Sequence, residues 1–386
     1  MNLNNKKNKH KKILKELEYY KDKDFTFSSG HILGSMCTQP HIIAKEAYMR
    51  FIETNLGDPE LFPGTKQLES NYTSFILKLL NAPKTATGLI GSGGTESNIT
   101  AIWLAKTLSK KREIIIPKSA HFSFDKIASL MDIKLVNIKL DKNYCMDISD
   151  LKKNLSKDTA AVVGIAGTTE LGTIDPIPEI SEICNDEKIF LHVDAAFGGF
   201  VIPFLKKLGQ KTTDFDFNLK GVMSISIDAH KMGYSTIPLG LLTIRKEKWL
   251  NNISVKTPYI STKKQPGLLA TRSGAPVAAA YAVSKYLGMK GYEDLIKRCM
   301  NVTRYTVEKI NNLNLNLVKK PVMNVIGIKL KNPSRVVKRL TEHGWKVNNM
   351  ERLSAIRIVL MPHVTKKIID EFIPDLKKVC KEVGEL

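Results

Sequence analysis

The stretch Ser226-Ile227-Asp228-Ala229-His230-Lys231-Met232-Gly233-Tyr234-Ser235 directly follows the apolar run that begins at Gly221. A short apolar run that ends in small and polar residues predicts a buried strand, so Lys231 lies just past a strand end. A solvated surface lysine rarely has a histidine and glycine or alanine as close neighbours. If it is partly desolvated and beside a proton acceptor, its amine is suited to form a Schiff base with a carbonyl cofactor.

Six further runs of strand length lie in the same part of the chain, and most are separated by helical patterns. The predicted strands span 86–90, 114–117, 134–138, 160–166, 189–193, 222–227 and 240–244. The predicted helices span 41–54, 66–81, 99–108, 124–131, 148–155 and 178–184. Strands that alternate with helices predict an α/β domain in which a mostly parallel seven-stranded sheet is covered on both faces.

The last third of the chain has a different pattern. A polar loop over 256–270 precedes a long helical stretch over 276–312. Strands near 325–330 and 355–360 then accompany helices near 334–343 and 365–383, which predicts a small α+β domain. We therefore expect an N-terminal tail and arm over 1–50, a large ligand-binding domain over 51–285 and a small C-terminal domain over 286–386.

The charge balance of the chain is unusual. The 386 residues are 43% hydrophobic and 25% charged, which is ordinary for a globular protein, but the net charge is +21. A basic protein must be considered as a nucleic-acid binder. The densest basic block, residues 6–12, has no interleaved aromatic residues and is interpreted as a solvated tail that leads into a helical pattern from Ile13.

Cysteine spacing and hydropathy exclude several other classes. The five cysteines are widely separated, and no Cys/His pattern has metal-ligand spacing, so we expect neither disulfides nor a metal site. No apolar run is long enough to cross a membrane, and no apolar segment typical of a secretory signal follows the basic N-terminus. These features favour the cytoplasm.

In a mostly parallel sheet, ligands bind at the carboxyl ends of the strands, so the residues after each strand are the candidates for a site. The glycine-rich turn 91–98 stands between a strand and a helix, where free N–H groups predict a phosphate site. No lysine follows the glycines as in a P-loop, and the dinucleotide-binding spacing is missing. The phosphate therefore belongs to another cofactor.

Two further strand ends carry side chains suited to an aromatic cofactor. Asp194 follows one strand and could pair with a pyridinium nitrogen, while the small Ala196 leaves room for a flat ring. His121 follows another strand and could stack on the ring from the opposite face. An aspartate after a strand caps a helix or a turn about half the time, and a lone histidine has a structural role more often than not. Together with Lys231 and the glycine turn, however, they indicate one site.

The sequence resembles the group II pyridoxal-phosphate-dependent amino acid decarboxylases, a family with the fold type I architecture of pyridoxal-phosphate enzymes. The resemblance covers nearly the whole chain. It rests on GSGGTESN at 91–98, His121, GTTELGTIDPI at 167–177, HVDAAFGG at 192–199 and SIDAHKMG at 226–233. Segments 55–65, 271–282 and 356–365 more closely resemble the short L-tyrosine/L-aspartate decarboxylases of methanogens.

The resemblance implies a role for each matching residue. Lys231 would bind pyridoxal 5'-phosphate covalently, Asp194 would hold the pyridine nitrogen, and His121 would stack opposite Ala196. The phosphate would be held by Gly94, Thr95 and His230, with Ser226 as a further candidate. Thr169 would lie near the phenolic oxygen or the reacting carboxylate, Arg357 would bind the substrate α-carboxylate, and Tyr259 would return a proton to Cα.

The resemblance also implies a homodimer with active sites at the interface, in which the loop that carries Tyr259, or Phe62, would serve the partner's site. Tyrosine decarboxylation would supply tyramine for methanofuran, and aspartate decarboxylation would supply β-alanine for coenzyme A. Leu61 and Phe62 are candidates for an apolar slot, and Arg272 or His31 for a side-chain donor. Three kinds of alternative remain. The substrate could be another amino acid such as glutamate, the reaction could be aminotransfer, desulfuration or retro-aldol cleavage, or the protein could bind nucleic acid on an inactive enzyme fold.

Overall fold

The computed structural model describes residues 3–258 and 262–386, and a seven-stranded sheet lies at its centre. The strand order is β1-β7-β6-β5-β4-β2-β3. These strands span Thr87–Gly91 (β1), Glu113–Pro117 (β2), Lys134–Ile138 (β3), Thr159–Ile165 (β4), Phe190–Asp194 (β5), Val222–Asp228 (β6) and Gly240–Ile244 (β7). Only β7 runs antiparallel to its neighbours, β1 and β6. This confirms the predicted α/β class and the mostly parallel sheet.

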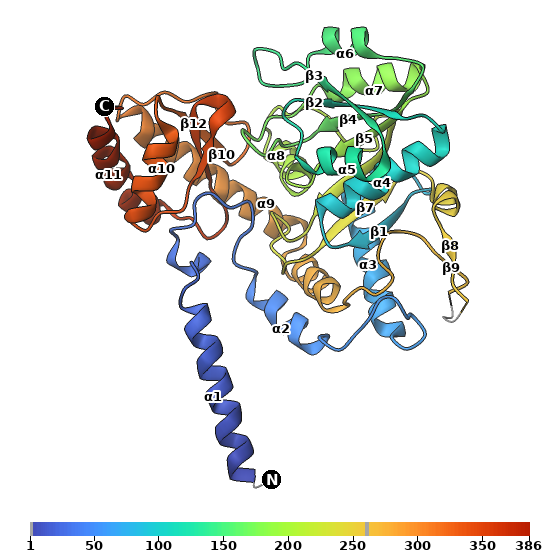
Figure 1. Ribbon diagram of the computed structural model, residues 1–386, viewed down its shortest axis with the longest axis horizontal. Coiled ribbons are helices and arrows are strands. Elements are labelled where there is room, and N and C mark those ends of the chain that lie inside the picture. Colours follow the sequence, from blue (N-terminus) through green and yellow to red (C-terminus); the bar gives the residue numbers. More distant parts are fainter. Residues whose placement is uncertain (1–2, 259–261) are drawn as a thin grey trace.

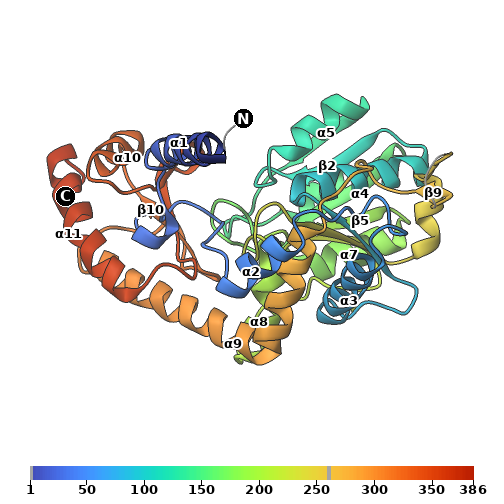
Figure 2. The same cartoon turned by 90° about the horizontal axis from the view of Figure 1, so that it is seen from below.

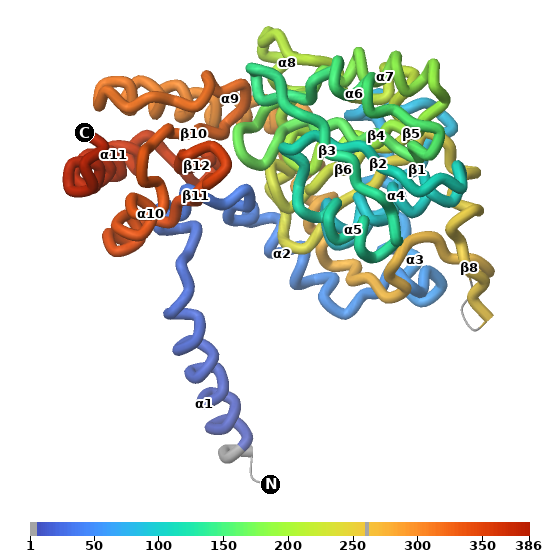
Figure 3. The backbone as a smooth tube through the Cα atoms, turned by 45° about the horizontal axis from the view of Figure 1, so that its top comes forward, coloured from blue at the N-terminus to red at the C-terminus, as the bar shows by residue number. Residues whose placement is uncertain are grey.

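Helices cover both faces of this sheet, as Figure 3 shows. The helices α4 (Gly94–Ser109) and α5 (Ser123–Met131) pack on one face. The opposite face is covered by α3 (Pro63–Leu79), α6 (Ile148–Asn154), α7 (Ile177–Asp186) and α8 (Ile202–Lys207). Buried on both faces, the central strands β2, β4 and β5 are apolar along most of their length.

A second, three-stranded antiparallel sheet follows toward the C-terminus, in the order β10-β12-β11. Its strands are β10 (Val325–Lys329), β11 (Asn348–Met350) and β12 (Ala355–Val359), and its helices are α10 (Pro333–Glu342) and α11 (Lys366–Val383). These elements form a hydrophobic core of their own that includes Trp345 and Phe372.

The long helix α9 (Ala275–Asn311) connects the two parts (Figure 2). It contacts α2 (Ile42–Arg50), α3 and α8 at one end and α11 and β10 at the other. Gly288 interrupts it with non-helical angles, φ 55° and ψ −171°. The interruption lies three residues past the predicted boundary at 285/286, and the division into domains stays a prediction.

The N-terminal helix α1 (Leu3–Lys21) projects away from the rest of the protein (Figure 1). The basic block 6–12, interpreted from the sequence as a tail, forms the first turns of this helix, and all residues from Lys6 to Thr26 are exposed. A short hairpin of β8 (Val255–Lys256) and β9 (Lys264–Gln265) flanks the undescribed residues 259–261. None of the described helices has the length and hydropathy needed to cross a membrane.

Candidate active site

The carboxyl ends of β1, β2, β4, β5 and β6 meet at one edge of the large sheet, because β1 runs in the same direction as β6 across the antiparallel β7. A cavity of about 440 Å³ opens at this edge, which is a volume typical of small-molecule sites. It brings together most of the residues predicted from the sequence. Its lining includes Gly94, Thr95, His121, Thr169, Asp194, Ala196, His230 and Lys231.

Lys231 lies three residues past the end of β6, and its side chain is 21% exposed. Its Nζ lies 3.1 Å from Oδ2 of Asp228, the last residue of β6. Burial alone would lower the pKa of Lys231, but the carboxylates of Asp228 and Asp194 outweigh it and raise the pKa above its usual value. The ammonium form is therefore stabilised in this cavity.

Asp194 ends β5, and three donors converge on its buried carboxylate. Oδ1 accepts hydrogen bonds from the backbone N of Ala196 and from Oγ of Ser226, both at 3.1 Å, and Oδ2 accepts one from Nδ2 of Asn98 at 2.8 Å. Burial acts to raise the pKa of Asp194, but the ammonium of Lys231 and the hydrogen bonds from Asn98 and Ala196 together lower it. This carboxylate is held in its ionised form.

The register between β5 and β6 explains part of this network. The parallel pairing places His192 beside Ser224 and Asp194 beside Ser226. Residues two apart on a strand share a face, so both pairs face α4. Nδ1 of His192 lies 2.8 Å from Oγ of Ser224, and Nε2 lies 2.9 Å from Oδ1 of Asn98 on α4. Burial lowers the pKa of His192 to about 4, so its imidazole is neutral.

The glycine turn after β1 forms a concave surface at the start of α4. Gly93 has a φ of 152°, and a Cβ there would lie 3.1 Å from Cε1 of His230. A Cβ at Gly94 would lie 3.1 Å from both Cβ of Ala196 and Oδ2 of Asp228. Because Gly93 offers no side chain to cap α4, the first N–H groups of the helix face this space. Nearby, Glu96 accepts hydrogen bonds from N and Oγ of Ser92, which fixes the turn.

His121 borders the cavity just before α5. Its Nδ1 accepts a hydrogen bond from the backbone N of Ser123 at 3.2 Å. Burial lowers the pKa of His121, although Asp194 acts in the opposite direction. A neutral imidazole next to the small Ala196 suits contact with a flat aromatic ring.

Arg357, on β12 of the small sheet, contacts Thr169, which lines the same cavity. Its guanidinium donates to the carbonyl oxygens of Thr169 and Gly34 at 2.6 and 2.7 Å and to Oδ1 of Asn348 at 3.0 Å. Its buried Nε has no acceptor among the described residues. Burial lowers the pKa of Arg357 to about 10, with Glu170 opposing this shift.

Other candidates from the sequence lie elsewhere. The fully buried hydroxyl of Ser226 donates to Asp194, so it is not available to a phosphate, contrary to the prediction. Leu61 is 71% exposed, and neither it nor Phe62 lines the cavity of Lys231. His31 packs against Trp345, with ring centroids 4.2 Å apart. Tyr259 lies outside the described residues.

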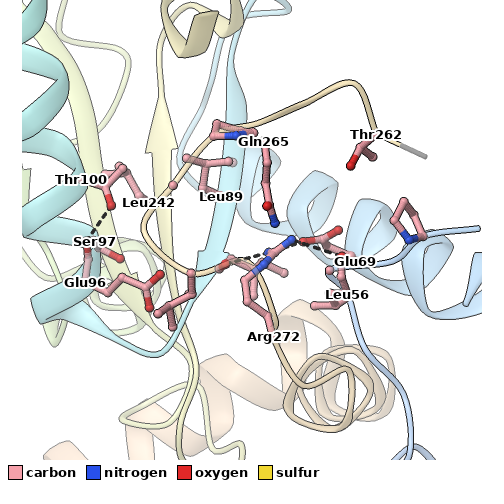
Figure 4. A pocket seen from close by; sticks show the side chains of 18 of the residues that line it. Leu56, Glu69, Leu89, Glu96, Ser97, Thr100, Leu242, Thr262, Gln265 and Arg272 are labelled. Carbon is pink, nitrogen blue, oxygen red and sulfur yellow. Dashed lines mark hydrogen bonds and ion pairs between the residues drawn. The ribbon is translucent and has the colours of Figure 1, made fainter. Parts of the chain in front are cut away.

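Arg272 lines a second, smaller cavity of about 250 Å³, which also contains Glu69 and Gln265 (Figure 4). Its guanidinium contacts Oε1 of Glu69 at 2.9 Å and donates to the carbonyl oxygen of Ile90 at 2.9 Å. These contacts tie β1 to α3. Within one chain they hold Arg272 away from Lys231, so the structure does not bring it to the substrate position expected from the sequence.

Three residues of the site were not assigned roles from the sequence: Asn98, His192 and Asp228. His192 could have been found, because it stands two residues before Asp194 on the same strand and must share its face. Asn98 lies one helical turn beyond Gly94. Asp228 lies three residues before Lys231, but the sequence does not show that Gly94 and Gly240 pack beside its carboxylate. No group of metal-ligating side chains occurs in the described ranges 3–258 and 262–386.

Comparison with known proteins agrees with this geometry. Residues 29–331 match the model of the pyridoxal-dependent decarboxylase conserved domain. An L-aspartate/L-glutamate decarboxylase of Pyrococcus horikoshii is 46% identical over 95% of this chain and 97% of its own. A probable L-tyrosine/L-aspartate decarboxylase of Methanothermobacter thermautotrophicus is 45% identical over 92% of this chain and 98% of its own.

Solved structures show the same fold. A sphingosine-1-phosphate lyase of Burkholderia pseudomallei has a TM-score of 0.88 and 25% identity, over 97% of this chain and 90% of that one. A glutamate decarboxylase of Lactobacillus brevis has a TM-score of 0.87 and 21% identity, over 97% of this chain and 92% of that one. The family match, the relatives and the strand-end cavity lead to one conclusion: this chain belongs to the pyridoxal-dependent decarboxylase family.

Proposed function

We propose that this pyridoxal-dependent decarboxylase removes the α-carboxylate of L-aspartate or L-tyrosine as carbon dioxide, giving β-alanine or tyramine. The observation that carries the proposal is that Lys231, Asp194 and His121 line one cavity, and that Arg357 contacts another residue of its lining, Thr169. The relatives at 44–46% identity whose names include L-aspartate, L-tyrosine or both support this choice of substrates.

The residues of the cavity fit pyridoxal 5'-phosphate. Glycine at 93 and 94 keeps side-chain atoms out of the turn, where a Cβ would crowd His230, Ala196 and Asp228, and the uncapped N–H groups of α4 suit a phosphate. Asp194 provides an ionised carboxylate for the pyridine nitrogen, and Lys231 provides the amine. When bound, pyridoxal 5'-phosphate supplies an aldehyde for that amine and a protonated ring that accepts the electrons left at Cα as carbon dioxide departs.

The chain's own side chains would orient the reaction. Asp194 would keep the ring nitrogen protonated, because three donors hold its carboxylate ionised. His121 would stack on the ring opposite Ala196. Gly94, Thr95 and His230 would hold the phosphate, and Thr169 would lie near the phenolic oxygen or the reacting carboxylate.

Arg357 is proposed to bind the substrate α-carboxylate through its buried Nε edge. Its other nitrogens are fixed by Thr169, Gly34 and Asn348, so the guanidinium is already oriented before substrate binds. A cation beside a departing carboxylate does not favour its loss as neutral carbon dioxide. The role of Arg357 is therefore orientation of the bond that breaks.

The active enzyme is proposed to be a homodimer. Large apolar side chains are exposed on α2, on α9 and just beyond α2, and α2 packs directly on α9. They are Ile42, Met49, Ile52, Tyr286 and Met289. A surface of this kind is typical of an interface between subunits. We propose that Phe62, Leu61 and the loop of Tyr259 serve the partner's site, with Tyr259 returning a proton to Cα, and that the enzyme acts in the cytoplasm.

The test measures carbon dioxide release from each of the twenty amino acids with purified protein and pyridoxal 5'-phosphate. Aspartate or tyrosine should give the highest kcat/KM. Preference for aspartate would connect the enzyme to coenzyme A synthesis, and preference for tyrosine to methanofuran synthesis. Stoichiometric keto-acid or aldehyde formation without carbon dioxide would instead indicate aminotransfer or retro-aldol cleavage.

Lys231→Ala provides the second test of the same proposal. The variant should still bind the cofactor, but borohydride should no longer fix it to the chain, and turnover should be lost. Full activity in Lys231→Ala would rule out the proposed site.

A further inference from the structure

The cavity contains two carboxylates whose surroundings differ. Asp194 receives three hydrogen bonds from neutral donors. Asp228, on the neighbouring strand, is 1% exposed and has no such donor among the described residues. Its Oδ2 lies 3.1 Å from Nζ of Lys231 and 3.7 Å from Nε2 of His230, and its Oδ1 has no partner.

Two glycines create the space in which the Asp228 carboxylate lies. A Cβ at Gly94 would lie 3.1 Å from Oδ2, and a Cβ at Gly240 would lie 2.5 Å from Oδ1. Any side chain at Gly240 would therefore displace the carboxylate. The fold confines Asp228 against Lys231 and the start of α4.

The contrast in hydrogen bonding suits the two carboxylates to different roles. A carboxylate with several fixed neutral donors stays ionised, since those donors stabilise the charge. A buried carboxylate whose close partner is an ammonium can accept that ammonium's proton, because the transfer removes both charges from a poorly solvated place. When one site contains two carboxylates in different surroundings, one commonly stays ionised while the other exchanges a proton.

Lys231 needs such a partner. The raised pKa of Lys231 means that its resting form is the ammonium, which has no lone pair to attack an aldehyde. The other groups that face Nζ are less suited to accept its proton. Asp194 is held ionised by its donors, Nδ1 of His121 is occupied by the backbone N of Ser123, and burial raises the pKa of the Cys37 thiol. His230 is assigned to the phosphate in the proposed function.

We propose that Asp228 takes a proton from Nζ of Lys231 when the lysine attaches to the cofactor aldehyde, and returns it to the departing oxygen. The freed lone pair of Nζ forms the new bond to the aldehyde carbon. The carbonyl oxygen then leaves as water with one proton from Asp228 and a second from Nζ, so the nitrogen keeps one hydrogen and a double bond to carbon. Proton and charge balance without any other reactant.

This inference rests on the proposed function, in which Lys231 is the attachment site. The experiment therefore tests the role of Asp228 separately from that of Lys231. Cofactor-free wild type and Asp228→Asn are mixed with pyridoxal 5'-phosphate, and the absorbance change on attachment is followed over time. Borohydride trapping and peptide mass then identify the modified residue. Binding of pyridoxine 5'-phosphate, which has no aldehyde, measures recognition of the ring and phosphate alone.

Asp228→Asn should attach the cofactor about 100-fold more slowly, which is the usual size of a lost acid–base contribution. Pyridoxine 5'-phosphate should bind it as tightly as wild type or more tightly, because a negative charge beside the phosphate position has gone. The matched control is Asp214→Asn, which removes the carboxylate that pairs with Lys206 outside the cavity, and it should behave as wild type in both assays.

Attachment at the wild-type rate in Asp228→Asn would overturn the proposal. So would slow attachment accompanied by an equal loss of pyridoxine 5'-phosphate binding, since that pattern indicates a distorted cavity. Trapping at a residue other than Lys231 would instead contradict the proposed function. Thermal unfolding of each cofactor-free variant shows whether it is folded before these results are compared.

Discussion

The side-chain amide of Asn98 donates to Oδ2 of Asp194 at 2.8 Å, while its carbonyl oxygen lies 2.9 Å from Nε2 of His192. An ionised carboxylate only accepts hydrogen bonds, so the amide nitrogen must face Asp194 and the amide oxygen must face His192. Nε2 of His192 then carries the proton, and Nδ1 accepts from Ser224 at 2.8 Å. Each donor in this series of hydrogen bonds, from Ser224 through His192 and Asn98, is therefore directed toward Asp194.

Asn98→Ala should raise the pKa of Asp194, because Oδ2 loses its donor in a buried place. The ionised form of Asp194 is required, so the acidic limb of the kcat/KM profile should move to higher pH. The measurement is the pH dependence of kcat/KM, with Asn71→Ala on the exposed face of α3 as the control. An unchanged acidic limb would show that Asn98 does not act on Asp194.

Asp194→Asn keeps the shape of the side chain but removes the charge that faces the pyridine nitrogen. The kcat for decarboxylation should fall by about 100-fold or more, as is typical when an electrostatic stabiliser is lost. The cofactor dissociation constant should change much less, since the phosphate contacts remain. Both are measured on the same preparation, with Asp125→Asn on the surface of α5 as the control. Equal losses in the two quantities would indicate a purely structural role.

Arg357→Lys removes the planar fork that contacts Thr169, Gly34 and Asn348 but keeps a positive charge. The KM for the amino acid should rise by about 10-fold or more, because a lysine cannot make these contacts and present a fixed edge. Cofactor absorbance should not change. Arg352→Lys, which alters the surface pair with Glu170, is the matched control. A KM equal to that of wild type would exclude Arg357 as the carboxylate ligand.

The buried carboxylate of Asp175 should make the free energy of unfolding depend on pH. Its buried carboxylate accepts from the backbone N of Met146 at 2.7 Å and of Ile165 at 2.8 Å, and burial raises its pKa from 3.8 to about 7. Between these values the folded chain holds a proton that the unfolded chain has lost, so this group lowers the free energy of unfolding as pH rises.

Asp175→Asn removes that contribution. The difference in unfolding free energy, variant minus wild type, should therefore increase from about pH 4 to about pH 7 and then level off. Denaturant unfolding at several pH values measures it, with Asp158→Asn as an exposed control. A difference that is constant with pH would show that Asp175 is ionised throughout.

The elements of the large sheet could be predicted closely from the sequence. The strands at 134–138 and 240–244 match the structure, and the other five differ by one residue at one or both ends. Each is a short apolar run between turn-forming residues, so local pattern decides it. The strand-end positions of Lys231, Asp194 and His121 follow from the same pattern.

What the sequence does not contain is the order of the strands and their register. Ser226 looked free to bind phosphate, yet the pairing of β5 with β6 sets it beside Asp194. Arg272 looked free to bind substrate, yet Glu69 on α3 lies within 2.9 Å. These two contacts join residues 32 and 203 positions apart, and only the folded arrangement shows them.

The projecting helix α1 has a thermodynamic consequence. Its apolar side chains Ile13, Leu14, Leu17 and Tyr20 are all about half exposed, so no surface within 3–258 and 262–386 buries them. A single helix of this length is marginal in water, because most helix stability comes from packing. Any further stabilisation of α1 by packing must come from a second molecule. The helix content of α1 then depends on the concentration of that molecule as well as on the sequence.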